Sequence, residues 1–281
     1  MAKSIMIQGT ASGVGKTILT IALCRILKQD GIKAAPFKAQ NMTANTCVTN
    51  DSEEIAVSQW LQAAAAGTEP CADMNPVILK PLSEQKSTQI ILNGKNYNTI
   101  DAYKYSETRQ KLTPEILSAY SRLANKYDVI IIEGAGSPVE LNLNRDDMIN
   151  MGVAIKVKAP VVIVSDIDRG GIFASLYGTV RLLKETERMH VKALIVNRFK
   201  GELSFFTDGA EILERITGIP VAGVIPYRKI DLPEEDSLYG GGTPFGKKAD
   251  FENQFNSIAD NVRKSLNMDL IYKIINEGIK Q

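Results

Sequence analysis

The stretch IQGTASGVGKT, residues 7–17, decides the fold, because it closely matches a phosphate-binding loop. Such a loop has a glycine, any four residues, and then Gly-Lys followed by Ser or Thr. Here the closing Gly-Lys-Thr17 is in place, but Thr10 stands at the position of the first glycine and Gly9 comes one residue early. A short apolar run precedes the loop and a helical pattern follows it, which is the context in which such a loop binds nucleotides.

The residues of this loop each offer a contact to a nucleotide. Its glycines permit backbone conformations that turn N–H groups toward a phosphate, and the start of the following helix adds a positive dipole. Lys16 can neutralise the terminal phosphates, and the Thr17 hydroxyl can bind Mg²⁺. We therefore predict that the loop binds ATP and Mg²⁺ through Gly9, Thr10, Ser12, Gly13, Val14, Gly15, Lys16, Thr17 and Thr20.

The rest of the chain alternates short apolar runs with helical patterns. Runs of consecutive apolar residues are typical of strands that are buried on both faces of a parallel sheet. The pattern predicts an α/β fold of the P-loop NTPase type, with a mostly parallel sheet flanked by helices. The expected strands are 4–8, 33–37, 128–133, 161–165, 191–197 and 221–225, and the expected helices are 16–29, 52–66, 145–157, 172–188 and 207–217.

Two regions depart from this alternation. Residues 88–95 predict a hairpin, since Asn93-Gly94 suits a tight turn, and a helix is expected over 114–126. Near the C-terminus, a glycine-rich stretch precedes a segment with apolar residues at helical spacing, which favours packing on its own domain or on a twin subunit in a homodimer. The expected division is an ATP-binding domain at 1–238, a linker at 239–249 and a helical tail at 250–281.

The composition excludes several functions. Of 281 residues, 33 are Lys or Arg and 32 are Asp or Glu, so the net charge of +1 gives no field for nucleic acid or an anionic membrane. No apolar run approaches the ~20 residues of a membrane span, and the N-terminus is too short and polar for a secretory signal. The three cysteines lack CxxC spacing, which favours reduced thiols in the cytoplasm. The one histidine, His190, excludes a zinc site built from several histidines.

Polar residues follow two of the predicted strands, at the sheet edge where α/β proteins bind their ligands. Glu133 ends a buried run, so its carboxylate can lie near the phosphates and bind Mg²⁺ directly or through water. The glycine turn after it, Gly134-Ala135-Gly136, lets backbone N–H groups approach an anionic substrate. After the next buried run, Asp166, Asp168 and Arg169 either hold a substrate carboxylate or, in the case of Asp168, cap the following helix.

The segment PFKAQNM, residues 36–42, closely resembles the corresponding segment of the cobyric acid synthase family. Further segments are similar to that family in the same order, from residue 4 to about residue 238. They are 54–56 with Gln59 and 62–66, then 74–81, 133–142, 165–175, 197–201 and 231–236. The resemblance implies an ATP-dependent carbon–nitrogen ligase that amidates corrinoid side-chain carboxylates in cobalamin biosynthesis through an acyl phosphate. The corrinoid substrate would be similar to adenosylcobyrinic acid a,c-diamide.

The loop G-T-x-x-x-V-G-K-T also resembles that of the dethiobiotin synthetase-like ATPases, a branch of the P-loop fold. This resemblance implies a metal site made by Thr17, Glu133 and an acidic residue after the second strand. Asp51 and Glu54 both suit the third position, and Glu54 is slightly favoured. The catalytic residues would be Lys16, Lys38 and Glu133.

The same resemblances imply the remaining contacts. Asn197, with Arg198 beside it, would read the adenine edge, because a side-chain amide offers the donor and acceptor that adenine needs. The substrate side of the site would be formed by Gln40, Asn41, Gly134, Ala135, Gly136, Asp166, Asp168 and Arg169.

Members of the cobyric acid synthase family continue into a class I glutaminase domain, which releases ammonia from glutamine. No cysteine follows Cys71 that could serve as the nucleophile of such a domain. We therefore expect one of three cases: ammonia comes from solution, it comes from a separate glutaminase subunit, or the protein has changed to another substrate.

Two alternative functions stay open. The first is a dethiobiotin synthetase-like carboxylase or cyclo-ligase, against which the segments at 36–42 and 165–171 count. The second is a MinD/ParA-like switch ATPase, which is disfavoured because Ala11 stands where that class carries a signature lysine.

Overall fold

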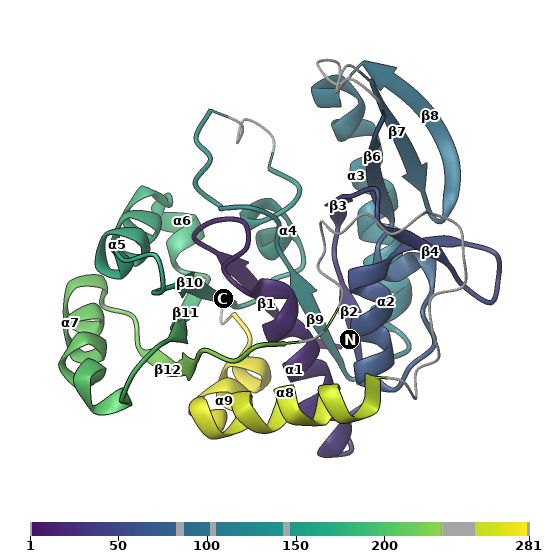
Figure 1. Cartoon of the computed structure of the whole chain (residues 1–281). Helices are drawn as coiled ribbons and strands as arrows, with labels where there is room; N and C mark the ends of the chain where they lie inside the picture. Colours follow the sequence, from purple (N-terminus) through teal and green to yellow (C-terminus); the bar gives the residue numbers. More distant parts are fainter. Residues whose placement is uncertain are drawn as a thin grey trace.

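The computed structural model describes residues 2–82, 87–101, 105–142, 147–230, 232 and 251–279. Within these residues the main sheet has six strands, all parallel, in the order β12-β11-β10-β1-β9-β2 (Figure 1). Their bounds are β1 Lys3–Gly9, β2 Ala34–Phe37, β9 Val129–Glu133, β10 Val161–Asp166, β11 Val191–Phe199 and β12 Val221–Pro226. The predicted α/β fold and its strands are confirmed, with ends that differ by one or two residues.

The central strands are buried on both faces, as their unbroken apolar runs predict. Ile5 to Ile7 in β1 and Ile130 to Ile132 in β9 are fully buried, and so are Val161 to Val164 in β10. Because alternate side chains of a strand point to opposite faces, such runs require a helical layer on each side of the sheet. The carboxyl ends of these strands, where the ligand site is predicted, are therefore supported by a closely packed core.

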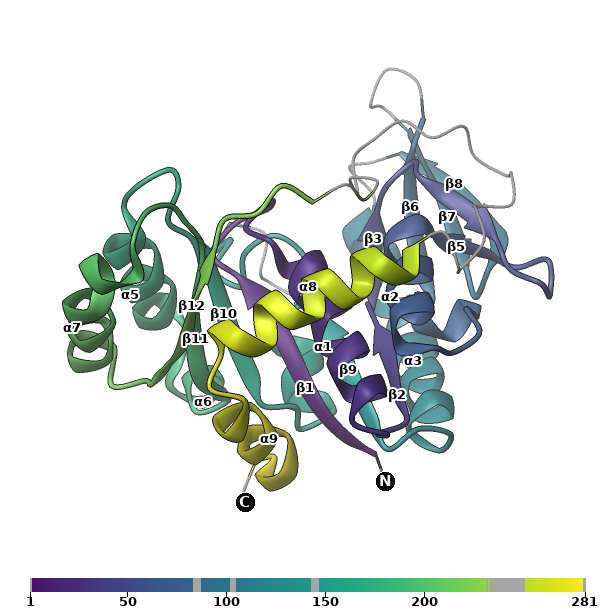
Figure 2. The same cartoon turned by 60° about the horizontal axis from the view of Figure 1, so that its bottom comes forward.

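The helices fall into two layers. Helix α1 (Lys16–Gln29) connects β1 to β2 and lies on the near face in Figure 2. The later connections from β9 to β10, β11 and β12 step along the sheet in the opposite direction, and right-handed crossovers therefore place their helices on the other face. These helices are α4 (Met151–Lys156), α5 (Ile172–Leu182), α6 (Glu185–Arg188) and α7 (Thr207–Thr217), with a short 3₁₀ turn, η5, at Leu203–Phe206.

A smaller sheet stands beside the main one, in the order β3-β6-β7-β8. Its strands are β3 Gln40–Met42, β6 Val77–Pro81, β7 Ser87–Leu92 and β8 Lys95–Asp101. The predicted hairpin is confirmed: β7 and β8 pair antiparallel, and Asn93 and Gly94 both have positive φ, at 49° and 75°. Such a pair of positive φ angles is typical of the type I′ turn.

Four predicted helices differ from the structure. Residues 54–56 of the predicted 52–66 helix form β5 (Glu54–Ala56), which pairs with β4 (Thr46–Val48), so α2 begins only at Val57 and ends at Ala66. The predicted 172–188 helix is broken at Leu183, whose ψ of 140° is extended, into α5 and α6. The helix expected at 114–126 is α3 (Tyr105–Ala124), which begins before Pro114, and α4 is shorter than expected. A 3₁₀ turn, η1, lies at Ala72–Met74.

The C-terminal segment forms two helices, α8 (Glu252–Ser265) and α9 (Met268–Glu277), which pack on the domain itself. Helix α8 lies across α1 (Figure 2), where the buried Arg25 donates to Glu252 and Asn256. Leu266, between the two helices, forms a bridge with Gly223 of β12. The glycine-rich linker predicted at 239–249 lies outside the described residues.

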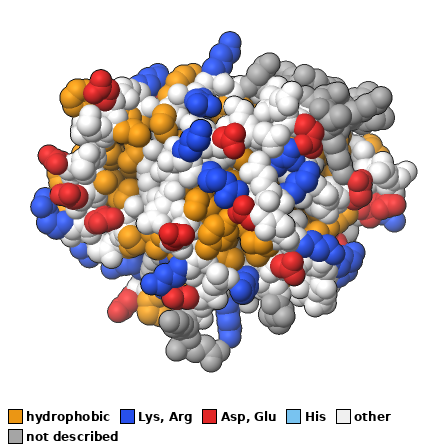
Figure 3. All heavy atoms as spheres, turned by 90° about the horizontal axis from the view of Figure 1, so that it is seen from below, with side chains coloured by type: hydrophobic (Ala, Val, Ile, Leu, Met, Phe, Trp, Pro, Cys, Tyr) orange, Lys and Arg blue, Asp and Glu red, His pale blue; other side chains and the backbone are white. Residues whose placement is uncertain are grey.

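The underside of the molecule, where α8 and α9 lie, mixes acidic, basic and hydrophobic side chains (Figure 3). This mixture agrees with the balanced composition of the chain. No helix among the described residues is both long enough and apolar enough to cross a membrane.

Candidate nucleotide and carboxylate site

The loop between β1 and α1 requires its glycines for conformation and for space. Gly13 and Gly15 have φ of 71° and 102°, in the region that favours glycine. A Cβ on Gly15 would lie 2.2 Å from Nδ2 of Asn197, and one on Gly9 would lie 2.6 Å from Cγ2 of Val14. The glycine that comes one residue early in the sequence is therefore required by close packing inside the loop.

Lys16 is buried and reaches back over the loop. Its Nζ donates to the carbonyl oxygens of Ala11, at 2.9 Å, and Gly136, at 3.1 Å. Gly136 belongs to the turn after β9, so the lysine joins the two loops that border the site. Of the other predicted loop residues, Thr10 shares a hydrogen bond with Ser165, and Thr20 donates to the Lys16 carbonyl within α1.

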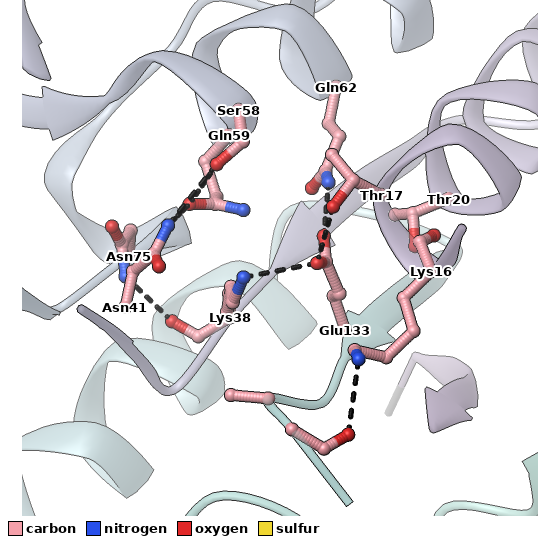
Figure 4. A network of polar contacts seen from close by, with 12 residues as sticks. Lys16, Thr17, Thr20, Lys38, Asn41, Ser58, Gln59, Gln62, Asn75 and Glu133 are labelled. Atoms are coloured by element: carbon pink, nitrogen blue, oxygen red, sulfur yellow. Dashed lines mark hydrogen bonds and ion pairs between the residues drawn. The ribbon is translucent and has the colours of Figure 1, made fainter. Parts of the chain in front are cut away.

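Glu133, the last residue of β9, lies at the centre of a buried polar network (Figure 4). Its Oε1 accepts from the Thr17 hydroxyl at 2.9 Å and from Lys38 Nζ at 3.0 Å. Its Oε2 accepts from the side-chain amide of Gln62 in α2. The side chains of Lys38 and Glu133 are only 3% and 0% exposed, so the ion pair is shielded from water. The structure thus brings together the predicted catalytic residues Lys38 and Glu133 with Thr17.

The segment after β2 is held in place by backbone contacts. The N–H of Lys38 donates to the Met74 carbonyl at 2.8 Å, and the Asn75 amide donates to the Lys38 carbonyl at 3.0 Å. Asn41, predicted on the substrate side, is buried, and its amide donates to Ser58 and Gln59 of α2. Gln40, two residues after Lys38, is also buried.

Thr17 and Glu133 offer oxygen donors on the same side of the loop, and this donor set fits Mg²⁺. The two acidic residues suggested for the third metal position have other surroundings. Glu54 in β5 is bonded to Thr46 and Lys80, and Asp51 is exposed before that strand. Among the described residues, no group of three or more His, Cys, Asp and Glu side chains is arranged to hold a metal.

The turn after β9 is fixed by Asn150, which begins α4. The Ala135 N–H donates to Asn150 Oδ1 at 3.1 Å, and the Asn150 amide returns a hydrogen bond to the Ala135 carbonyl at 2.7 Å. A Cβ on Gly134 would lie 2.3 Å from Asn150 Oδ1, so glycine is required there. Sequence reasoning missed Asn150, because the helix was predicted over 145–157 and this residue would then lie inside it, whereas in the structure it directly precedes α4.

Two acidic residues, one at the end of β10 and one shortly after it, are ion-paired with residues at the end of β11 and just beyond it. Asp166 accepts from Arg198 at 2.8 Å, and Asp168 accepts from Lys200 at 2.7 Å. The hydrogen bond to Asp168 raises the pKa of Lys200. Helix α5 begins after Gly171, so Asp168 does not cap it, and Arg169 is exposed. These contacts occupy both carboxylates that were predicted to face the substrate.

Asn197 ties the end of β11 to the loop, because its amide donates to the Val14 carbonyl at 2.8 Å. The next residue, Arg198, has a φ of 60°, which is uncommon for a residue other than glycine. The strained backbone lies beside a shift in the register of β11 with β12. Strain of this kind is concentrated at ligand-binding positions in proteins.

The cysteines and the histidine take no part in this network. Burial, and then the negative charge of Glu133, raise the pKa of the Cys24 thiol, and burial together with Glu54 raises that of Cys47 to about 12. His190 is buried, and its Nδ1 lies 3.0 Å from the Ala159 carbonyl. Cys24, Cys47 and His190 are thus buried, as is typical of residues that contribute to packing.

Comparison with known proteins finds a domain family and curated relatives that match most of this chain. A family model described as the CobQ/CobB/MinD/ParA nucleotide binding domain matches residues 5–238. The cobyric acid synthase of Ruminiclostridium cellulolyticum is 51% identical over 238 residues, which cover 85% of this chain and 46% of the relative. The cobyric acid synthase of Citrobacter koseri is 48% identical over 238 residues, with 85% and 47% covered.

The chain thus spans about half the length of the curated relatives it matches. The predicted resemblance to the cobyric acid synthases is confirmed for this half. Among solved structures, the signal recognition particle receptor FtsY of Elizabethkingia anophelis is 17% identical with a TM-score of 0.45, over 91% of this chain and 65% of that one.

Proposed function

The chain belongs to the CobQ/CobB/MinD/ParA nucleotide-binding domain family, and from this membership we propose that it is an ATP- and Mg²⁺-dependent ligase that converts corrinoid side-chain carboxylates into amides. Relatives that are 51% and 48% identical carry the name cobyric acid synthase, which supports this substrate class. The proposal covers the ATP-dependent half of the reaction, since the chain spans about half of those relatives.

The observation that carries the proposal is the contact of the half-buried Thr17 and the buried Lys38 with the buried Glu133, beside the phosphate-binding loop. A carboxylate and a hydroxyl that share a hydrogen bond at the start of α1 suit a Mg²⁺–nucleotide complex. Lys38 supplies a second positive charge on the side of the site away from Lys16. Two lysines on either side of a phosphoryl group can stabilise the charge that develops during its transfer.

In the proposed reaction, an oxygen of the substrate carboxylate attacks the terminal phosphorus of ATP, and ADP leaves. The acyl phosphate then reacts with ammonia at its carbonyl carbon, inorganic phosphate leaves and a proton is released. Mg²⁺, held by Thr17 and Glu133, would neutralise phosphate charge when bound. Lys16 and the N–H groups of the loop would hold the phosphates, and Lys38 would orient the attacking carboxylate.

The contact of Asn197 with the loop supports its proposed role at the adenine base. The ion pairs of Asp166 and Asp168 suggest that these residues shape the wall of the site and leave the substrate contact to the turn at Gly134-Ala135-Gly136. Arg169 is exposed, so we retain it as a candidate contact to a substrate carboxylate.

We propose that ammonia is supplied from solution or by a glutaminase site that the described residues do not form. The raised pKa of Cys24 and Cys47 disfavours both thiols as glutaminase nucleophiles, since the thiolate is the reactive form. The reaction itself requires no histidine base, which agrees with the buried position of His190.

The proposal is tested by incubating the purified chain with ATP, Mg²⁺, ammonium and cobyrinic acid a,c-diamide. Mass spectrometry should show exchange of hydroxyl for amino groups on the corrinoid, with one phosphate released for each amide. Glu133→Gln serves as the matched control and should slow both readouts. ATP hydrolysis without any change in the corrinoid would contradict the proposed substrate, and absence of nucleotide binding would contradict the proposed activity as a whole.

A further inference from the structure

We propose that Gln62 is a positioning residue that fixes the carboxylate of Glu133 in the orientation in which Oε1 faces Thr17 and Lys38. The part of the proposal in which Gln62 supports the contact between Glu133 and Lys38 is argued from geometry alone. The effect on Mg²⁺ rests on the proposed function, in which Glu133 binds the metal.

The two carboxylate oxygens of Glu133 have different partners. Oε1 accepts from both Thr17 and Lys38, whereas Oε2 accepts from Gln62 (Figure 4). A carboxylate that is bonded on one oxygen only can rotate about its terminal torsion, which is broad in proteins. A donor on the second oxygen restricts that rotation. The two oxygens are chemically equivalent, so Gln62 is the contact that fixes the plane of the carboxylate, with one oxygen directed at Thr17 and Lys38.

The amide of Gln62 has one favourable orientation. Glu133 accepts and cannot donate as a carboxylate, so the NH₂ group of Gln62 must face it. The other end of the amide, Oε1, is buried and has no hydrogen-bond partner among the described residues. An unpaired buried oxygen is unfavourable, so the contact with Glu133 holds the amide against this cost. The Gln62 amide therefore has one favourable orientation, with its NH₂ group directed at Glu133.

The backbone around Gln62 is well anchored. Helix α2 is buried from Val57 to Ala65, and Trp60 packs edge-on against Phe251, with ring centroids 6.3 Å apart. The alanines at 63–65 are fully buried or nearly so. Close packing of this kind leaves the glutamine little freedom to move away from Glu133.

Gln59, one turn earlier in α2, provides a matched control. It is equally buried, but its oxygen accepts from Asn41 and Ser58, and no hydrogen bond joins it to Glu133 among the described contacts. Gln→Met keeps the length and approximate volume of the side chain and removes the amide. Both substitutions therefore make similar changes in packing and remove buried hydrogen bonds, but only Gln62→Met removes a contact to Glu133, whereas Gln59→Met removes the acceptor of Asn41 and Ser58.

The first experiment needs no ligand. Thermal unfolding of Gln62→Met should lower Tm by roughly 2–8 °C, because a buried carboxylate oxygen loses its donor. The same substitution in a Glu133→Gln background should lower Tm by about half as much, since hydrogen bonds to a charged group are roughly twice as strong. Equal losses in both backgrounds would contradict the proposal.

A second measurement remains valid if Gln62→Met folds poorly. The side-chain amide signal of Gln62 in ¹H–¹⁵N spectra is compared between the wild type and two variants that keep Gln62. It should shift in Glu133→Gln and keep its wild-type position in Gln59→Met. A Gln62 amide that does not respond to Glu133→Gln would overturn the positioning role.

The third experiment tests the metal. The affinity of the ATP-loaded chain for Mn²⁺, followed by electron paramagnetic resonance, should fall about 10–100-fold in Gln62→Met and stay within about two-fold in Gln59→Met. An unchanged affinity together with the expected Tm coupling would refute the step through the metal while the contact to Glu133 stands. Failure of both would overturn the positioning role, whatever reaction the chain catalyses.

Discussion

Lys38→Met provides the sharpest test of the buried ion pair. The ammonium of Lys38 lies 3.0 Å from Glu133 Oε1, and both side chains are almost fully shielded from solvent. Removing one partner of a buried pair typically costs about 3–5 kcal/mol, because the other charge is left uncompensated. Thr17 and Gln62 still donate to Glu133, so we expect the low end, about 3 kcal/mol, which corresponds to a fall in Tm of roughly 6–12 °C.

The companion change, Glu133→Gln, should be milder. The amide oxygen can still accept from Lys38 and Thr17, and Gln62 can turn its unpaired Oε1 toward the new NH₂ group. We expect a loss of about 1–3 kcal/mol from the buried ammonium that remains. Lys38→Met/Glu133→Gln contains neither charge, so its stability should return to within about 1 kcal/mol of the wild type, although the proposed ligase activity should be lost.

Urea unfolding followed by circular dichroism measures all four proteins under one set of conditions. The expected coupling between the two positions is at least about 3 kcal/mol, which is well above the ~0.5 kcal/mol within which independent sites add. A double variant whose destabilisation equals the sum of the single losses would refute the reasoning. It would mean that Lys38 and Glu133 are not held together as an ion pair in the folded protein.

Three further predictions follow from other contacts. Lys16→Ala should reduce ATP turnover to background in a phosphate-release assay, and wild-type turnover would remove this lysine from the mechanism. Gly15→Ala places a Cβ 2.2 Å from Asn197 Nδ2 at a φ of 102°, so calorimetry should show loss of ATP binding; unchanged affinity would mean that the loop can adapt. The hydrogen bond from Arg25 lowers the pKa of Glu252 from its ordinary 4.5, so this contact stabilises the fold fully above that pH and is lost as pH falls through the lower folded value. The Tm of the wild type should therefore fall more steeply below pH 4.5 than that of Glu252→Gln, and parallel curves would count against it.

The main sheet could be predicted from the sequence because its signals are local. Each strand is a run of consecutive apolar residues, and the glycine-rich loop marks the first crossover. The missed strand β5 has no such signal. Its three residues, Glu54–Ala56, form a strand only because Thr46–Val48 lies beside them, and a helical continuation into α2 fits the same letters. Tertiary pairing therefore decides the boundary between strand and helix there.

The candidate site was predictable to the extent that strand ends define it. Glu133 ends β9, Lys38 directly follows β2 and Thr17 lies in the first turn of α1, and the structure brings all three into contact. Ion pairs between loops carry no such pattern. The partners of Asp166 and Asp168 come from the end of β11, and a sequence alone does not tell whether such carboxylates face a ligand or a neighbouring cation.

Gln62 illustrates the limit most clearly. The segment VSQWLQAAAA is apolar except for one serine and two glutamines, and a helix buried on all sides must give such amides a polar partner. The pattern thus indicates that α2 faces something polar. It does not identify the partner, because Glu133 lies 71 residues away along the chain and reaches α2 only through the pairing of β9 with β2. The parallel order of the sheet, set by the crossovers, places the end of β9 beside α2 and so brings the buried amide of Gln62 into contact with the site. Altering that amide alone therefore tests whether this contact positions the Glu133 carboxylate.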